Sequence, residues 1–584
     1  MQAEQVQRSL PFQPFPLQWR VDQGLYRSEI HLNFVGQGWW EDESNTLLRR
    51  NFAIPDSNMF VTTFILSALL EAASLDAIEL APDDQSFHLA LDAVLSFKDK
   101  NRPAGVPVYS FWPQEKINGT WAANPFVAEI FKSVGLEGFY EECVSIEFAA
   151  VVLEGYIKAY HIPADLDDSS VNMALGGMLA AQRDKFPQAY AKWEAVNSNV
   201  TGLFELINKF TDLIDPRSYY FMHPFLAQLS QPSLALGCTW LMDLVGDNKT
   251  SGVVGMPFHV NNVDMTVISN FLYGTSQAVL EELNGGAAKQ YFISHPDFQQ
   301  VYENSAQAIS WAIETGAAAA RPDISLLYYP SIYDFLWMAA RTARYLNAKG
   351  SATNAIPTLA RAKDRLTAAL KDAGTQQILA SAHYDSVGAY WDDFLGDYGQ
   401  VERGEDRLFS TALAINMLID VWSVPSTNGS GCKLQWARDV PETIAPLVSG
   451  GIAYLRRYLL SGEFELGNAF FSGSMKGDTT APWSYPATYS HLRNGTALDP
   501  ITGALPDDAQ DWFNLVYGMK GVVPDSTYRK MTDLKWWGNS TPKQFLGFNA
   551  PGSAWPYWSS PAMTYAMSLI ALANFQALQQ CPIS

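Results

Sequence analysis

Three aspartates, Asp165, Asp167 and Asp168, lie within four residues of one another in the stretch ADLDDSSVNMAL. If water is excluded from this turn, the three carboxylates cannot all stay ionised. The pKa of one of them then rises, and that group keeps a proton at neutral pH. If the turn is solvated, the same residues form an ordinary helix cap, because carboxylates accept hydrogen bonds from the free N–H groups of a first helical turn. The string therefore predicts either a general acid or a cap.

The order of the aspartates indicates which of them would be the acid. We expect a helix over 168–184, so Asp168 is expected to cap it and to stay ionised. Asp167 is then the better candidate for the retained proton, with Asp165 and Asp168 as its supports. His161 precedes the string. It is expected either to hydrogen-bond one of the aspartates and tune its pKa or to be a structural histidine.

The elements that must position these residues are mainly helices. Residues 1–58 alternate in the manner of strands and are expected to form a short β-containing segment. From residue 59 onward, apolar spacing and caps predict helices. The predicted ranges are 59–75, 86–98, 125–136, 143–160, 168–184, 187–195, 201–213, 233–245, 264–284, 298–316, 330–348, 355–373, 408–422, 440–461 and 559–579.

Two kinds of helix alternate along the chain. Some, such as VDMTVISNFLYGTS, are apolar or small all round, whereas others, such as AIPTLARAKDRLTAALKDA, are apolar on one face. This alternation favours two concentric layers. Ser, Thr or Asp opens each inner helix, so these ends would ring one mouth. We predict an all-α fold, an α/α toroid of six or seven helical hairpins. It would consist of the N-terminal segment 1–58 and a main domain 59–584, with long aromatic loops at 381–407 and 463–558.

The acid string resembles the motif of class II terpene cyclases of the squalene–hopene and diterpene type. The resemblance rests on ADLDDSSVNMAL, in which D-x-D-D follows a Pro and opens a small-residue helix. It implies an α/α-barrel isomerase in which Asp167 protonates an isoprenoid alkene and aromatic rings stabilise the carbocation. The rings and polar groups expected at the pocket are His161, Asp264, Tyr328, Tyr329, Trp337, Tyr390 and Trp391.

Further aspartates offer a metal alternative. Asp507, Asp508 and Asp511 form a D-D-x-x-D string, and Asp392, Asp393 and Asp397 form a looser one. Carboxylate groups of this kind suit Mg²⁺ or Ca²⁺, but solvated turn residues have the same pattern. We expect no cofactor, with Mg²⁺ needed only if the substrate carries a diphosphate.

Two other functions remain open at the level of sequence. Secreted α/α barrels often process polysaccharides with two carboxylates across a cleft lined by aromatic rings. The carboxylates for such a hydrolase or lyase would come from Asp167, Asp264, Asp392, Asp393, Glu402 and Glu405, and the stacking rings from Tyr390, Trp391, Trp483 and Trp555. A third possibility is a toroid that binds a lipid or protein without catalysis.

Composition limits the partners. The formal net charge is −21, which disfavours nucleic acid and anionic membrane surfaces. No window is long and apolar enough to predict an integral membrane span. We expect a hydrophobic small-molecule substrate. N-glycans and a secreted or endomembrane-lumen location are expected from six sequons, at Asn118, Asn199, Asn248, Asn428, Asn494 and Asn539. Four cysteines allow two disulfides, of which Cys432–Cys581 is the preferred pair.

Overall fold

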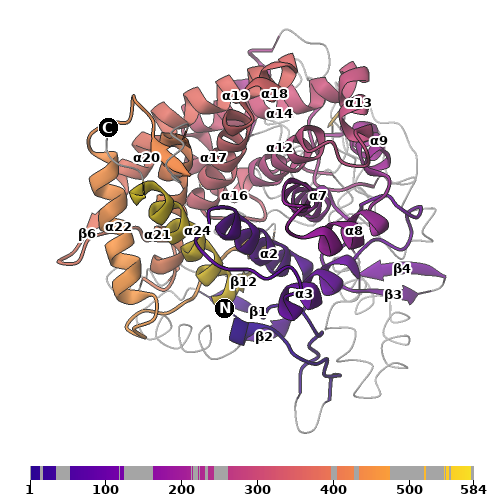
Figure 1. Ribbon diagram of the computed structural model, residues 1–584, viewed down its shortest axis with the longest axis horizontal. Helices are drawn as coiled ribbons and strands as arrows, with labels where there is room; N and C mark the ends of the chain where they lie inside the picture. The colour runs from indigo at the N-terminus through magenta and orange to yellow at the C-terminus, as the bar shows by residue number, and fades with distance from the viewer. Residues whose placement is uncertain are drawn as a thin grey trace, which may run out of the picture.

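The computed structural model is mostly helical, with small antiparallel sheets (Figure 1). It describes residues 2–13, 18–34, 53–117, 119–123, 162–211, 213–214, 221–222, 224–229, 234–242, 261–395, 404–426, 433–473, 519–520, 545, 547–550 and 554–580.

Six helices of the described chain pack against one another in a closed series. They are α2 (Met59–Ser74), α7 (Leu166–Ala181), α12 (Met265–Leu280), α17 (Ile332–Ala348), α21 (Arg407–Trp422) and α24 (Pro561–Gln579). Each packs against the next in this order, and α24 packs against α2 again, so the series of contacts is closed. Five of them, α2, α7, α12, α21 and α24, are helices that the sequence marks as apolar all round, and their burial follows from that pattern, whereas α17 was not among those predicted to be so.

Amphipathic helices pack against the outside of this series (Figure 1). Helix α3 (Gln85–Leu95) contacts α2, and α8 (Pro187–Val196) contacts α7. Helix α14 (Pro296–Glu314) lies on α12, α19 (Pro357–Ala369) on α17, and α22 (Ile444–Tyr458) on α21. The remaining helices are short: α9 (Val200–Phe210), α13 (Ala287–Ser294), α15 (Ala317–Ala320), α16 (Pro322–Ser325), α18 (Gly350–Asn354), α20 (Thr375–Ala380), the 3₁₀ turn Gln2–Glu4 and the π-helical turn Leu370–Gly374.

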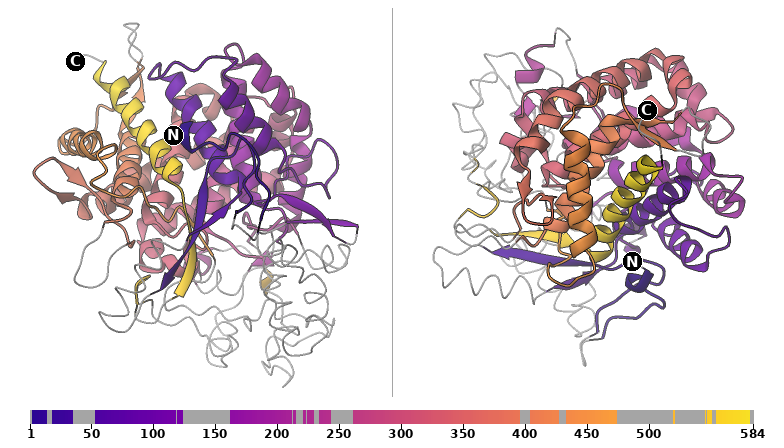
Figure 2. Two further views of the ribbon diagram at one scale, coloured as in Figure 1. Left: turned by 90° about the horizontal axis from the view of Figure 1, so that it is seen from below. Right: turned by 60° about the vertical axis from the view of Figure 1, so that its left-hand side comes forward.

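A four-stranded antiparallel sheet joins the two ends of the chain. Its strand order is β10 (Phe471–Ser472), β12 (Ala554–Ser559), β1 (Ser28–Phe34) and β2 (Ile54–Asp56). Figure 2 shows β1 and β12 side by side, with α24 rising from β12 towards the C-terminus. The predicted strands in 1–58 are thus present, and they share a sheet with strands from the end of the chain. Four two-stranded ladders complete the strands: β3 (Gln114–Ile117) with β4 (Thr120–Ala123), β5 (Leu213–Ile214) with β11 (Met519–Lys520), β6 (His383–Tyr384) with β7 (Ala389–Tyr390), and β8 (Ser423–Pro425) with β9 (Leu434–Trp436).

One predicted helix is wrong. Residues 234–242, inside the expected helix 233–245, are not helical. Their backbone groups pair with distant segments: Leu166 donates to the Thr239 carbonyl at 2.7 Å, and Thr239 donates to the Asn262 carbonyl at 2.9 Å. A short apolar run is compatible with either a helix or a buried non-helical segment. Here the long-range backbone hydrogen bonds stabilise the non-helical conformation. The expected helices 125–136 and 143–160 lie outside the described residues, as does most of 474–553.

Within the described residues, no helix combines the length and apolarity needed to cross a membrane.

Candidate active site

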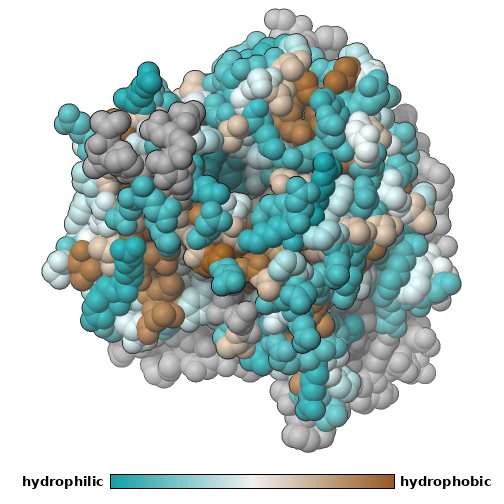
Figure 3. Space-filling model, in the orientation of Figure 1, coloured by the Kyte–Doolittle hydropathy of each residue, from teal (hydrophilic) through white to brown (hydrophobic). Residues whose placement is uncertain are grey.

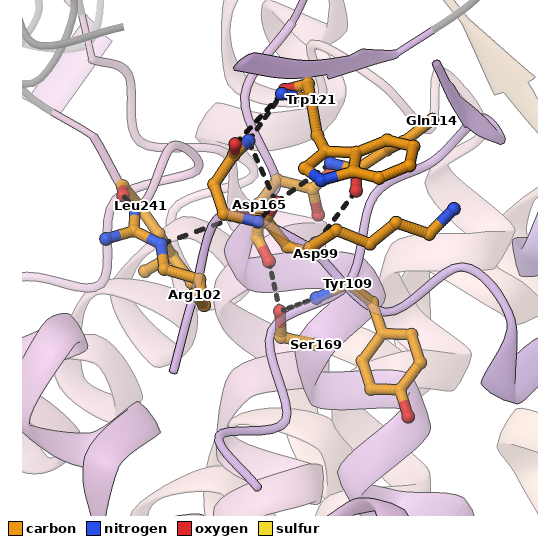
Figure 4. A network of polar contacts seen from close by, with 10 residues as sticks. Asp99, Arg102, Tyr109, Gln114, Trp121, Asp165, Ser169 and Leu241 are labelled. Atoms are coloured by element: carbon orange, nitrogen blue, oxygen red, sulfur yellow. Dashed lines mark hydrogen bonds and ion pairs between the residues drawn. The ribbon is translucent and has the colours of Figure 1, made fainter. Parts of the chain in front are cut away.

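Asp165, rather than Asp168, caps helix α7. Its side chain accepts a hydrogen bond from the Asp168 backbone N–H at 2.8 Å, and its backbone is in extended geometry. The Ser169 hydroxyl donates to the Asp165 carbonyl, and the Tyr109 N–H donates to that hydroxyl at 3.0 Å (Figure 4). The expectation that Asp168 is the cap is therefore wrong, because the helix begins two residues earlier than predicted.

Asp165 and Asp168 form a buried carboxyl pair. Burial raises the pKa of Asp165 to about 6. The pKa of Asp168 is raised well above its usual range, first by burial and then by the charge of Asp165. Both oxygens of the Asp168 carboxyl group are buried without a hydrogen-bond partner in the described part of the chain. The expectation that Asp168 stays ionised is thus contradicted. A helix N-terminus favours an anion, but desolvation of two adjacent carboxyl groups outweighs that effect.

Asp167 lies beside this pair but has its own partners. Its Oδ1 accepts a hydrogen bond from Asn270 Nδ2 at 2.7 Å, and its Oδ2 is hydrogen-bonded to the Tyr329 hydroxyl. The side chain is buried, and burial together with the charge of Asp165 raises its pKa to about 8, although the two hydrogen bonds act in the opposite direction. Asp167 therefore keeps its proton at neutral pH.

A buried arginine, Arg341, is connected to Asp167 through Asn270. Arg341 Nη2 donates to Asn270 Oδ1, and the guanidinium lies over the rings of Tyr273, Phe64 and Trp337 at 4.4, 4.9 and 4.9 Å from their centroids. Burial lowers the pKa of this guanidinium from its usual value. Asn270 and Arg341 are not predicted from the sequence. For Arg341, the available signal was an arginine within the apolar run DFLWMAARTARYL. No sequence pattern marked Asn270.

Asp264 positions the segment that carries Tyr329. It caps α12 by accepting from the Thr266 N–H at 2.7 Å, and its other oxygen accepts from the Tyr328 N–H at 2.8 Å. The Tyr328 hydroxyl in turn accepts from Asn262 Nδ2 at 3.0 Å. Both carboxylate oxygens of Asp264 thus accept hydrogen bonds from backbone N–H groups. These contacts give the residue a structural role in positioning the Tyr329 segment rather than a role facing a substrate.

Aromatic rings surround the Tyr329 side chain. Its ring centroid lies 5.2 Å from that of Phe60 and 5.5 Å from that of Phe471. Among the other expected rings, Trp337 packs on Phe64 at 6.0 Å and so belongs to the same group. Phe60, Phe64 and Phe471 were not predicted, because nothing in a single sequence separates pocket rings from core rings.

Tyr390 and Trp391 lie elsewhere. The Trp391 indole is fully buried and donates to the Ile378 carbonyl at 2.9 Å. Tyr390 stacks on Tyr454 at 5.1 Å, with the Arg407 guanidinium 4.3 Å from its ring centroid. No described hydrogen bond or ring contact connects either residue to Asp167. The expectation that they form its pocket is not supported by these contacts.

A second acidic group lies at the start of α17 and α21. Asp406 accepts from the backbone N–H groups of Asp393 at 3.2 Å and Leu395 at 2.9 Å. Burial raises the pKa of Asp406 to about 7, and it raises those of Asp334 and Asp393 well above their usual range. Both carboxyl oxygens of Asp334 are buried without a hydrogen-bond partner in the described part of the chain.

A pocket of about 440 Å³ opens beside Asp393. Its size falls in the range of small-molecule sites. Pro330, the residue after Tyr329, forms part of its wall, so the pocket adjoins the segment that contacts Asp167. Its described lining is Ala319, Pro322, Pro330, Ile332, Asp393, Phe394, Phe545, Gly547, Phe548 and Asn549.

The metal candidates are only partly described. Asp392 pairs with Arg407 through an N–O distance of 2.6 Å, which occupies its carboxylate. Among the described residues, no group of three or more His, Cys, Asp or Glu side chains is arranged to hold a metal ion. Asp397 and the string Asp507, Asp508 and Asp511 lie outside the described residues, as do His161, Glu402, Trp483 and the cysteines Cys143, Cys432 and Cys581.

The comparisons with known proteins were negative: no protein-family model, curated protein or solved structure matches this chain significantly. The geometry of the site is therefore the basis for inferring function.

Proposed function

We propose that this protein is an isomerase of the class II terpene cyclase kind, in which Asp167 is a general acid that starts the cyclisation of an isoprenoid by protonation. The observation that carries the proposal is the state of Asp167: a buried carboxyl with a pKa of about 8, next to aromatic rings. An acid that stays protonated at neutral pH is what alkene protonation requires.

The proposed architecture is an α/α toroid. The closed series α2, α7, α12, α17, α21 and α24 would be its inner layer, and the amphipathic helices its outer layer. Supporting this, the starts of neighbouring inner helices are connected. Segment 109–111 accepts backbone hydrogen bonds from Met59, the first residue of α2, and from Asp165, the cap of α7, and Asp264, the cap of α12, accepts from the Tyr328 N–H just before α17. The N-terminal ends of the inner helices, and the acids they carry, would thus surround one mouth. The opposite face, with a hydrophilic hollow near its centre, is seen in Figure 3.

The surroundings of Asp167 suit a cationic intermediate. The Tyr329 hydroxyl contacts Asp167, and the rings of Phe60 and Phe471 pack against the Tyr329 ring. Aromatic rings attract positive charge. We propose a substrate without a diphosphate, because Arg341 is already engaged by Asn270 and three rings. Mg²⁺ would enter only with a diphosphate substrate.

The test is turnover by purified protein. Wild type is incubated with squalene, oxidosqualene and prenyl diphosphates, and the products are analysed for rings by mass spectrometry. Asp167→Asn is expected to lower turnover by roughly 10²-fold or more, since a general acid contributes about that much. Asp184→Asn, an exposed aspartate beyond the end of the same helix, is the matched control and should keep full activity. Full activity in Asp167→Asn would refute the proposal.

A carbohydrate-active enzyme is the second candidate. One observation favours it: Asp393 lines an open pocket with Phe394, Phe545 and Phe548, at the same end of the helices as Asp167. Two carboxyl groups near aromatic rings are the usual equipment of glycoside hydrolysis. Release of reducing sugar from an oligosaccharide panel, lost in Asp393→Asn but retained in Asp184→Asn, would support this function over cyclisation. A toroid that only binds its ligand would show neither activity.

We also propose that the protein is secreted and N-glycosylated. Among the sequons, Asn199 is described: it is exposed and caps α9, and its Oδ1 accepts from the Gly202 N–H at 3.0 Å and the Thr201 hydroxyl at 2.9 Å. A glycan on Nδ2 would preserve both bonds. A mass shift after N-glycosidase treatment of protein from a secreting host is the measurement that checks this. The other five sequons lie outside the described residues.

A further inference from the structure

The wall of the pocket beside Asp393 is mostly apolar. Among its described residues, Asp393 and Asn549 carry polar side-chain groups, and the others are alanine, proline, isoleucine, glycine and phenylalanine. The Asn549 amide is already engaged, because its Nδ2 donates to the Phe394 carbonyl at 2.6 Å and its Oδ1 accepts from Asn33 at 3.3 Å. Among the described side chains of the wall, Asp393 is therefore the one left to contact a polar ligand.

The negative charge beside this pocket exceeds the positive charge that the described residues supply. Asp392 pairs with Arg407 through N–O distances of 2.6 and 2.9 Å. Within the described part of the chain, Asp334, Asp393 and Asp406 make no ion pair, and Oδ2 of Asp393 and both carboxyl oxygens of Asp334 are buried without a hydrogen-bond partner. A ligand with a positive charge would compensate this excess.

The same surroundings act on the proton of Asp393. Burial raises the pKa of its carboxyl group well above the usual range, and the charges of Asp406 and Asp392 raise it further, whereas a hydrogen bond from Ser331 acts in the opposite direction. The protonated form of Asp393 is therefore favoured as long as no cation is near. A bound cation would favour the carboxylate instead, so its binding should release this proton.

The rings in the wall indicate which kind of cation fits. Phe394 and Phe545 pack against Phe548, with ring centroids 4.3 and 5.1 Å away. A metal ion or an ammonium group with N–H donors needs several acceptors, and the described side chains of the wall offer one carboxyl group. A quaternary ammonium has no N–H donors, and its methyl groups suit aromatic rings, which attract positive charge. A volume of about 440 Å³ admits such a group with a short chain attached.

We propose that this pocket binds a quaternary ammonium ligand, with Asp393 as the counter-ion and Phe394, Phe545 and Phe548 as the aromatic wall around the cationic group. The site is separate from the chemistry proposed at Asp167 and binds its ligand without changing it. It is an alternative to glycoside hydrolysis at the same pocket, because a sugar needs many hydrogen-bond partners to replace those it has in water.

A first experiment compares two ligands that differ in charge. Choline and 3,3-dimethylbutan-1-ol have nearly the same shape, but choline has a quaternary nitrogen where the alcohol has a carbon. Isothermal titration calorimetry of the full-length wild-type protein at pH 7 should give a dissociation constant about 10-fold or more lower for choline. Equal affinities for the two ligands, or no binding of choline, would overturn the proposal.

A second experiment follows the proton. Titrations with choline in phosphate and in Tris, which have different ionisation enthalpies, should reveal a proton released on binding, and the affinity should rise from pH 6 to pH 8. Asp393→Asn should abolish the release. The described titratable and charged groups around Asp393 are Tyr333 and Asp334 on α17, Asp392 in its own segment, and Glu405, Asp406 and Arg407 at the start of α21.

Asp406 is the neighbour that could release a proton in place of Asp393, because burial raises its pKa to about 7. In Asp406→Asn the release should persist at a lower pH, since a charge that raises the pKa of Asp393 is removed. Release that persists in Asp393→Asn but is lost in Asp406→Asn would overturn the role of Asp393 as counter-ion.

Site variants test the two parts of the wall. Asp393→Asn should weaken choline binding by about 10-fold or more, whereas Asp184→Asn, on an exposed aspartate, should bind choline like wild type. Phe548→Leu should weaken choline binding by about 2- to 30-fold and affect the neutral alcohol less. Wild-type affinity in Asp393→Asn would overturn the proposal, and equal weakening of both ligands in Phe548→Leu would overturn the role of the rings. Circular dichroism verifies that each variant is folded.

A disaccharide separates this proposal from the carbohydrate alternative. Cellobiose is titrated under the same conditions, and it should bind more weakly than choline. Tighter binding of cellobiose, lost in Asp393→Asn, would overturn the proposal in favour of a sugar site. These are binding measurements without turnover, so their failure would leave Asp167 and the proposed cyclisation unaffected.

Discussion

At the residue scale, the three aspartates of one turn have separate tasks. Asp165 caps the helix, and Asp168 is buried beside it. Asp167 accepts hydrogen bonds from two side chains, those of Asn270 and Tyr329. The differences come from surroundings, since the three side chains are chemically identical. Asp167 is the member whose side-chain partners come from elsewhere in the chain, Asn270 from helix α12 and Tyr329 from the segment between α16 and α17. This is why we assign the chemistry to it and support to the other two.

Catalysis should depend on pH through this carboxyl. Asp167 has a pKa of about 8, so turnover should be constant near pH 7 and fall above pH 8 as the proton is lost. The initial rate on the best substrate, measured from pH 6 to 10, checks this. The Asn270→Leu variant offers a comparison, because its falling limb should move to higher pH. A rate that rises through pH 9 would contradict the role of Asp167 as an acid.

Stability should also depend on pH, and the sign follows from proton binding. The folded state keeps a proton on Asp167 that the unfolded state, with an ordinary aspartate, releases near pH 4. Between about pH 4 and pH 8 the native state therefore binds more protons, and stability falls as pH rises, by up to about 1.4 kcal/mol per pH unit for one such group. Denaturant unfolding at pH 5 and pH 7.5 should show a smaller fall in Asp167→Asn than in wild type. Equal falls would contradict the raised pKa.

The sequence predicted the aspartates of the site but not the residues that contact them. The string itself marked Asp165, Asp167 and Asp168, because three carboxyl groups in one turn are conspicuous. Asn270 and Arg341 come from helices about 100 and 170 residues further along, and their contact with Asp167 depends on how those helices pack. A single sequence contains no distance between such residues, so these partners could not be predicted.

At the element scale, the close approach of α7 and α12 sets the site. A Cβ added at Gly274 would lie 2.4 Å from the Ser170 carbonyl oxygen, which is backbone and cannot move aside cheaply. Gly274 is one helical turn from Asn270, whose bond to Asp167 spans the two helices. Because residue 274 has no side chain, α7 and α12 can approach closely enough for the Asn270 amide to reach the Asp167 carboxyl group.

Gly274→Ala should therefore both destabilise the protein and disturb the site. Overpacking of this kind costs about 1–3 kcal/mol, and we expect turnover to fall as Asn270 moves away from Asp167. Urea unfolding and the initial rate are the two measurements. Gly374→Ala is the matched control, since its nearest contact is the flexible end of Met417 at 3.1 Å. Similar losses of stability in the two variants would argue against the close-approach explanation.

Helix positions were predicted well where apolar periodicity is long. The predicted 59–75 and 408–422 agree with α2 and α21 within a residue. The error at 233–245 arose where an apolar run is short and its backbone pairs with residues far away in the chain. The start of α7 was misplaced because any of three aspartates could cap it, and only the backbone geometry of Asp165 distinguishes them.

At the scale of the whole molecule, Asp56 connects the two ends of the chain. Its carboxylate accepts from the indole N–H groups of Trp112 and Trp558, each at 2.9 Å, and from Asn58 Nδ2 at 2.9 Å. Asn58 caps α2, and Trp558 lies on β12 just before α24. One buried carboxylate thus joins the first inner helix to the strand that leads into the last.

Asp56→Ala should destabilise the protein by about 3 kcal/mol or more, because two buried indole donors lose their acceptor at about 1–3 kcal/mol each. Asp56→Asn keeps one carbonyl acceptor and should lose less. Unfolding followed by tryptophan fluorescence and by circular dichroism provides the measurement, with the exposed Asp83→Ala as control. If Asp56→Ala unfolds like wild type, this network does not hold the ends together.

The register of β1 and β12 has a mechanical consequence. Glu29 faces Ser559 and Phe34 faces Ala554, so the end of β1 nearer the N-terminus and the end of β12 nearer the C-terminus lie together. Force applied through the two termini would reach this pair at that shared end and separate its hydrogen bonds one after another, instead of loading them in parallel. In an optical trap, the seam between the strands should therefore open at low force once α24 has been peeled away.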